Sequence, residues 1–185
     1  MERTFNYDIM PEIKQRWSPR AFSNEKIPHE EILALLEAAR YAPSCFNEQP
    51  WRFIVADDEP ALSKLCNVLT PNNQLWANAA PVLILILAKK QFSMNGNTNY
   101  WHMFDTGTAW GYLTLEAQRR GLISHAMGGF SNNGARTAFN IPDDYDIITV
   151  AAVGRYGNKE DLSEDLQKRE QPADRKDMEY LLLKF

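Results

Sequence analysis

Residues 14–53 form the most informative stretch of the chain, which begins KQRWSPRAF (residues 14–22) and ends APSCFNEQPWRF (residues 42–53). The first part sets Arg16 and Arg20 around a serine and a proline, and a guanidinium is a planar fork of donors suited to phosphate. The second part joins two prolines and several amides to an apolar run, which predicts a rigid polar loop leading into a strand. Together they suit a ligand with a phosphate at one end and a polar ring at the other.

The hydrophobic pattern around this stretch predicts helices and strands in mixed order. Apolar residues recur at helical spacing in residues 27–41, and Pro43 stops that helix. WRFIVA (residues 51–56) and VLILILA (residues 82–88) read as strands, and the unbroken apolar run of the second predicts a strand covered on both faces. Further helices are expected at residues 7–16, 60–69, 75–80, 100–120 and 133–139, with strands at 122–127 and 147–155.

Length and composition set limits on the function. A chain of 185 residues is expected to form one domain over residues 1–185, and its net charge of −4 lacks the basic footprint of nucleic-acid binding. The start has no leader pattern, and the longest apolar run, residues 79–88, has ten residues, half of a membrane span of about 20. We therefore expect no membrane partner and a cytoplasmic location, with Cys45 and Cys66 as free thiols.

Two apolar segments predict a dimer. The helix expected at residues 100–120 is apolar nearly all round, and a chain of this size would struggle to surround it. The tail MEYLLLKF (residues 178–185) is expected to pack on its own sheet or on a partner subunit. The segment at residues 158–175 is charged and is expected to cross the surface.

The motifs R-x-S-x-R-x-F and A-P-S-x-x-N-x-Q-P-W-x-F together resemble the nitroreductase family of FMN-dependent oxidoreductases. The resemblance extends over about residues 9–182 and is densest in the first third. It implies an α+β fold of three layers, in which helices flank a mainly antiparallel central sheet. It also implies a homodimer with FMN at the subunit interface.

By this resemblance, the first motif holds the phosphate end of FMN. Arg16 and Ser18, with Trp17 between them, would bind the phosphate and the ribityl chain. Arg20 would lie beside the pyrimidine side of the isoalloxazine. A fixed cation there stabilises the negative charge that two-electron reduction leaves near N1 and O2.

The second motif would line the flavin ring with Pro43, Ser44, Cys45 and Asn47, and would face the FMN that is bound mainly by the other chain. A nucleophilic role for Cys45 is not expected, because no histidine in the sequence is tied to it as a base.

Later segments of the chain are matched more briefly. Asn72 or Asn73 would donate to the pyrimidine oxygens, and the alternative is a turn rich in asparagine. Backbone N–H groups of the segment Met127, Gly128 and Gly129 would face N5 and O4 of the flavin. Some relatives carry a glutamate at the position of Gly128, so its absence leaves the substrate preference open.

The charged end of the chain offers two further candidates. Arg175, with Lys176 as the second candidate, would contact the phosphate, and the alternative is a solvated run of charges.

The implied reaction is a ping-pong transfer of a hydride from NADH or NADPH through FMN to a nitroaromatic, a quinone or a related small acceptor. The alternative is an FMN storage or sensor protein with little turnover. No side chain is assigned as catalytic, and the three histidines have no metal-ligand spacing. Asp105 and Glu116 lie about 16 Å apart on the expected helix, too far for a paired acid and base, and are read as polar contacts.

Overall fold

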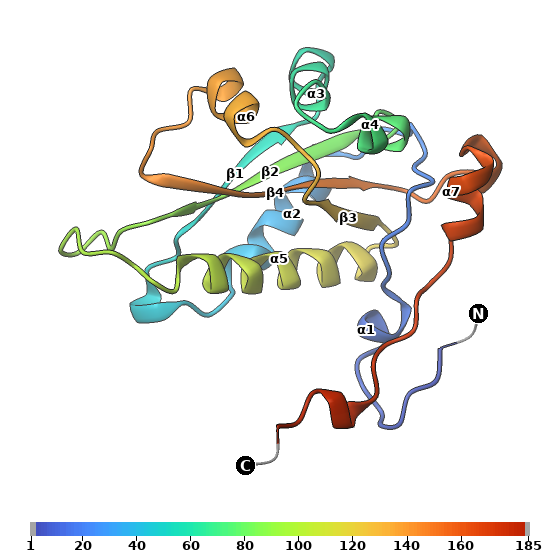
Figure 1. Ribbon diagram of the computed structural model, residues 1–185, viewed down its shortest axis with the longest axis horizontal. Helices are drawn as coiled ribbons and strands as arrows, with labels where there is room; N and C mark the ends of the chain where they lie inside the picture. Colours follow the sequence, from blue (N-terminus) through green and yellow to red (C-terminus); the bar gives the residue numbers. More distant parts are fainter. Residues whose placement is uncertain (1–2, 184–185) are drawn as a thin grey trace.

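The computed structural model describes residues 3–183, and its centre is a four-stranded antiparallel sheet (Figure 1). The order across the sheet is β1-β2-β4-β3, and every neighbouring pair is antiparallel. The strands are β1 (Trp51–Ala56), β2 (Val82–Lys89), β3 (Ile123–Met127) and β4 (Tyr145–Gly154). The expected α+β fold with a mainly antiparallel sheet is confirmed.

Helices cover both faces of the sheet, so the molecule has three layers (Figure 1). The helices are α1 (Pro11–Gln15), α2 (His29–Arg40), α3 (Glu59–Cys66), α4 (Pro71–Ala77), α5 (His102–Arg119), α6 (Asn132–Phe139) and α7 (Glu164–Arg169). Strand β2 decides the layering, because its side chains are buried on both sides. Leu83 and Leu85 pack with the core under α3, α4 and α6, whereas Ile84 and Ile86 pack with the core under α2 and α5.

Several expected helices begin or end elsewhere. The first covers only residues 11–15, because Pro11 occupies the first helical turn and the chain before it is not helical. Residues 70–74, which lie between the helices expected at 60–69 and 75–80, instead begin α4: Thr70 is the N-cap and Pro71 sits in the first turn. The charged stretch at residues 158–175 contains α7 and one deeply buried carboxylate, Glu170.

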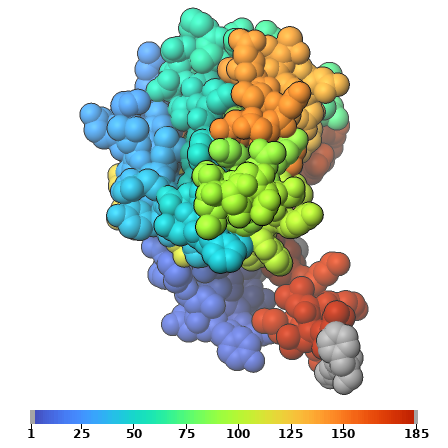
Figure 2. Space-filling model, turned by 90° about the vertical axis from the view of Figure 1, so that its left-hand side faces the viewer, coloured from blue at the N-terminus to red at the C-terminus, as the bar shows by residue number. Residues whose placement is uncertain are grey.

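Two apolar segments remain uncovered in the single chain. Helix α5 buries one face, with Ala109 and Leu113, while the apolar side chain of Phe104 on the opposite face is exposed, so the single chain does not surround the helix. The tail does not pack on its own sheet: the side chains of Met178 and Tyr180 are exposed. Figures 1 and 2 show the described segments before α1 and after α7 projecting from the body on the same side.

None of the helices among residues 3–183 combines the length and the apolar character needed to cross a bilayer. Over the same residues, no group of three or more histidine, cysteine, aspartate or glutamate side chains could hold a metal ion. Cys45 and Cys66 are both free.

Candidate functional site

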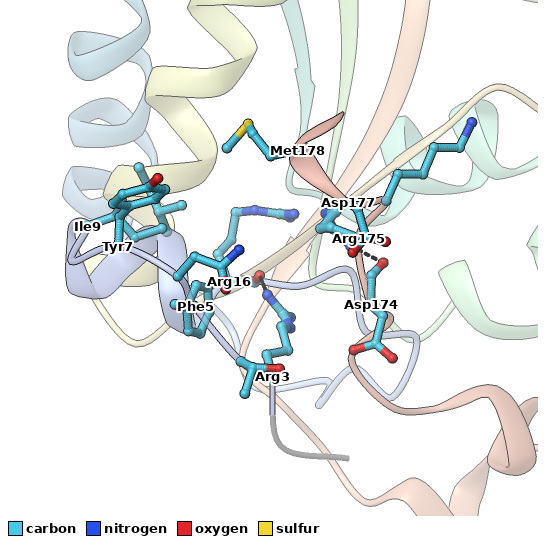
Figure 3. Close-up of a pocket in the computed structure, with 13 residues that line it drawn as sticks. Arg3, Phe5, Tyr7, Ile9, Arg16, Asp174, Arg175, Asp177 and Met178 are labelled. Atoms are coloured by element: carbon cyan, nitrogen blue, oxygen red, sulfur yellow. Dashed lines mark hydrogen bonds between the residues drawn. The ribbon is translucent and has the colours of Figure 1, made fainter. Parts of the chain in front are cut away.

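A pocket of about 720 Å³ lies between the N-terminal segment and residues 174–178, and we call it the basic pocket (Figure 3). Arg3, Arg16, Arg175 and Lys176 are among the residues that line it. The structure thus brings Arg16 together with both candidates from the end of the chain. Arg3, which the motifs do not include, joins them by donating through Nη1 to the Arg16 carbonyl at 2.9 Å.

The guanidiniums of the basic pocket repel one another. Burial, with the charges of Arg175 and Arg3, lowers the pKa of the half-buried Arg16 guanidinium. Burial and the charge of Arg175 likewise lower the pKa of Arg3, and Asp174 offsets this only in part. Within residues 3–183, no carboxylate lies at ion-pair distance from Arg16. An anion with several oxygens would relieve this repulsion, and phosphate matches the donor geometry of arginine.

Side chains from distant parts of the sequence hold the segment Arg16–Ala21 in place. Glu170 accepts hydrogen bonds from the backbone N–H of Arg20 at 2.8 Å and of Ala21 at 2.9 Å, and it is 4% exposed. His125 donates from Nδ1 to the Pro19 carbonyl at 2.9 Å, since a carbonyl can only accept. Neither residue was assigned by the motifs, because each acts through contacts far apart in sequence.

Charge and burial also affect the second arginine of the motif. Burial and the charge of Arg169 lower the pKa of Arg20, while Glu170 raises it. Burial lowers the pKa of His125, the Pro19 hydrogen bond opposes this, and the charges of Arg20 and Arg16 add to the lowering. Arg20 is not among the residues that line the basic pocket, so the two arginines of the motif have separate surroundings.

Residues 43–49 form a second distinctive segment, which we call the left-handed loop. Phe46, Asn47 and Gln49 all have positive φ angles, 52°, 56° and 52°, although none is glycine. Such conformations are uncommon for non-glycine residues and are a genuine outlier for a bulky one. Strained backbone of this kind clusters at binding sites, where the surroundings hold it.

Two side-chain contacts hold the left-handed loop. Asp105 of α5 is 3% exposed and accepts a hydrogen bond from the Cys45 N–H at 3.0 Å. Ser44 accepts through Oγ from the Gln49 N–H at 3.0 Å. Reading Asp105 only as a helix polar contact therefore missed its partner, which lies 60 residues earlier.

The left-handed loop and α1, which leads into Arg16, lie at opposite ends of α5. Asp105 in the first turn of α5 bonds the loop, while α1 packs on α5 and its Glu12 faces Arg119 in the last turn. Fourteen residues separate Asp105 from Arg119, which corresponds to about 21 Å of helix. Within one chain, Arg16 and the left-handed loop therefore do not line a common pocket.

The third group of predicted residues lies at the end of β3. Asn73 donates through Nδ2 to the Gly129 carbonyl at 2.9 Å, whereas Asn72 is exposed on α4. The structure thus joins Asn73, rather than Asn72, to the glycine segment. Met127 is buried, and a Cβ added to Gly128 would meet nothing within 4 Å, so this backbone is open to a flat ligand.

Comparison with known proteins gives consistent matches. The model of the nitroreductase family matches residues 13–68 and 59–155. A crystal structure described as an oxidoreductase containing FMN is 33% identical, with a TM-score of 0.93, and the alignment covers 98% of this chain and 93% of that one.

Two curated relatives are also similar. An Archaeoglobus fulgidus protein with the provisional name NADH dehydrogenase/NAD(P)H nitroreductase is 29% identical, over 82% of this chain and 87% of its own. An iodotyrosine deiodinase from Thermotoga neapolitana is 28% identical, over 80% of this chain and 87% of its own.

Proposed function

The chain belongs to the nitroreductase family, and from that premise we propose that it binds FMN and transfers electrons from NAD(P)H to a small organic acceptor. The general activity, oxidoreductase, is that of the family and of the FMN-containing structure. The observation that carries the proposal is the basic pocket, in which the charges of Arg3, Arg16 and Arg175 act on one another without a paired carboxylate at Arg16.

The residues of this pocket fit the phosphate of FMN. Arg16 and Arg175 would hold the phosphate, and Arg3 would add a third guanidinium. When bound, FMN supplies the redox chemistry, because its ring accepts the two electrons of a hydride and passes them to the acceptor. NAD(P)H and the acceptor would use the site in turn, which is a ping-pong mechanism.

The role of this chain's own residues is to bind the cofactor and set its electrostatics. Arg20 would lie beside the pyrimidine side of the ring, where its charge favours the reduced, anionic form. Asn73 and the open backbone at Gly128 would meet the ring edge. Since no side chain is assigned as a general acid, protons would come from water.

A homodimer would complete the site. The left-handed loop and the basic pocket lie at opposite ends of α5, so Pro43–Asn47 would face the FMN of the partner. The exposed side chains of Phe104 on α5 and of Tyr180 in the tail supply apolar surface for this contact. We propose that residues 1–185 form a single FMN-binding domain of this dimer.

The visible spectrum of the purified protein, taken before and after anaerobic addition of NADH or NADPH, tests the function. A yellow protein that bleaches supports the oxidoreductase. A yellow protein that does not bleach supports the alternative, a storage or sensor protein. A colourless protein that cannot be reconstituted with FMN overturns the proposal.

A further inference from the structure

A second groove, of about 610 Å³, lies between the left-handed loop and the excursion at residues 91–100, which joins β2 to α5. Figure 2 shows these two segments side by side, in cyan and light green. Four large side chains line it, Phe46, Phe92, Met94 and Tyr100, and the rest of its lining is asparagine and threonine. We call it the aromatic groove. Phe46 and Tyr100 are each 83% exposed, which is unusual for two aromatic rings beside one groove.

The walls of the aromatic groove are held in place. The rings of Phe46 and Phe92 meet edge to face, with centroids 5.9 Å apart and planes at 78°. Phe46 keeps its left-handed backbone because Asp105 and Ser44 fix the residues on either side. On the facing wall, the fully buried Asn99 accepts through Oδ1 from the Trp101 N–H at 3.0 Å.

The charge of the groove limits what it can bind. None of its lining residues carries a charge at neutral pH. The carboxylate of Glu48 is bonded to this excursion, since it accepts from the N–H and the hydroxyl of Ser93 at 2.9 and 2.6 Å. Lys90, at the start of the excursion, is paired with Asp146 at 3.2 Å. Arg52 donates to the Gln49 and Trp51 carbonyls at 2.9 and 2.7 Å and does not line the groove. A carboxylate on a ligand would therefore meet no cation in the lining and would lose its hydration.

We propose that the aromatic groove selects flat, uncharged aromatic electron acceptors and discriminates against aromatic acceptors that carry a carboxylate, amino acids included. The inference rests on the proposed function, because Phe46 stands between Cys45 and Asn47, which that proposal sets against the flavin. It separates this chain from the relatives named for iodotyrosine, an amino acid with both a carboxylate and an ammonium group.

Binding to the oxidised, FMN-loaded protein tests this selection without turnover. Isothermal calorimetry with 4-nitrobenzyl alcohol and with 4-nitrobenzoate, in the absence of reductant, compares two ligands of similar shape and different charge. 4-Nitrobenzyl alcohol is expected to bind at least about fivefold more tightly than 4-nitrobenzoate, because the benzoate must give up the hydration of its carboxylate. Equal affinity for the two ligands would overturn the proposal.

Three variants locate the effect. Phe46→Ala and Phe92→Ala are each expected to weaken binding of the neutral ligand about two- to tenfold through loss of aromatic contact. Thr98→Arg places a cation in the groove and should tighten binding of 4-nitrobenzoate about two- to fivefold. Thr137→Arg makes the same change at an exposed position of α6, outside the groove, and should leave the ratio of the two affinities unaltered.

Failure of the groove proposal can be distinguished from failure of the proposed function. The flavin spectrum reports whether each variant folds and keeps its cofactor, so loss of binding counts only in a yellow protein. Unchanged affinities in yellow Phe46→Ala and Phe92→Ala proteins would overturn the groove assignment while leaving the oxidoreductase intact. A Phe46→Ala protein that becomes monomeric in sedimentation would also overturn it, because a second copy of the chain would then cover the groove.

Discussion

The segment Arg16–Ala21 and the left-handed loop, which carry the first and the second sequence motif, are stabilised in opposite ways. They are called here the first half and the second half of the site. The segment Arg16–Ala21 is half-buried, and the distant side chains of Glu170 and His125 hold it through hydrogen bonds to its backbone. The left-handed loop is partly exposed, and the buried carboxylate of Asp105 and the hydroxyl of Ser44 hold its strained backbone conformation. The first half holds positively charged side chains in place, and the second half holds the backbone in one conformation. A ligand with an anionic end and a flat ring requires both.

The largest expected effect comes from breaking the first half. Glu170→Ala would leave the N–H groups of Arg20 and Ala21 without their acceptor and should lower the free energy of unfolding by about 3 kcal/mol. Urea titrations measure this loss. Glu170→Gln keeps an acceptor oxygen and should lose less. Equal losses in the two variants would show that packing, rather than hydrogen bonding, explains the role of Glu170.

Substituting Arg16 and Arg20 one at a time should show that the two side chains have different roles, one in FMN affinity and one in the reduction potential. Arg16→Ala removes a donor from the basic pocket and is expected to weaken FMN binding about 30- to 100-fold, as loss of a charged hydrogen bond implies. Arg20→Ala should lower the FMN affinity less and lower the reduction potential by about 30 mV, equivalent to about 1.4 kcal/mol for two electrons. Fluorescence titration and spectroelectrochemistry measure the two. An unchanged potential in Arg20→Ala would remove its assigned role.

The sequence predicts these two halves unequally well. Arg16, Ser18 and Arg20 are visible as a motif because the residue types alone carry the phosphate chemistry. Glu170 is not visible, since it lies in a run of charged residues and acts on a backbone 150 positions earlier. Arg3 is likewise hidden, because only the fold brings the N-terminal segment beside Arg175.

The second half is predictable as a loop but not as a conformation. Two prolines and several amides indicate the turn between α2 and β1, and β1 begins and ends where its apolar run does. Positive φ angles are usually signalled by glycine, and the left-handed loop contains none, so its strain has no signature in sequence. Strand β2 is predicted well because its apolar run needs cover on both faces, whichever helices supply it.

A smaller effect should follow from loosening the second half. Asp105→Asn keeps the size of the side chain but weakens its bond to the Cys45 N–H, at an expected cost of about 1 kcal/mol in local stability. Amide hydrogen exchange should then become about fivefold faster at Cys45 and stay unchanged at Ala21. Asp143→Asn, at an exposed aspartate, serves as the control. Faster exchange at both amides would mean that the two halves are not independent.

The smallest expected effect is a pH dependence confined to the first half. Because burial lowers the pKa of His125 in the folded protein, the imidazole stays neutral there while the unfolded chain takes up a proton below about pH 6.5. His125 thus contributes stability that is fully present above that pH and is lost as the pH falls toward the lowered pKa. Protonation would also oppose the nearby charges of Arg20 and Arg16. The free energy of unfolding, measured by urea titration, should decline less steeply between pH 7.5 and pH 5 in His125→Gln than in the unmodified chain. Equal slopes in His125→Gln and in the unmodified chain would refute a buried neutral His125.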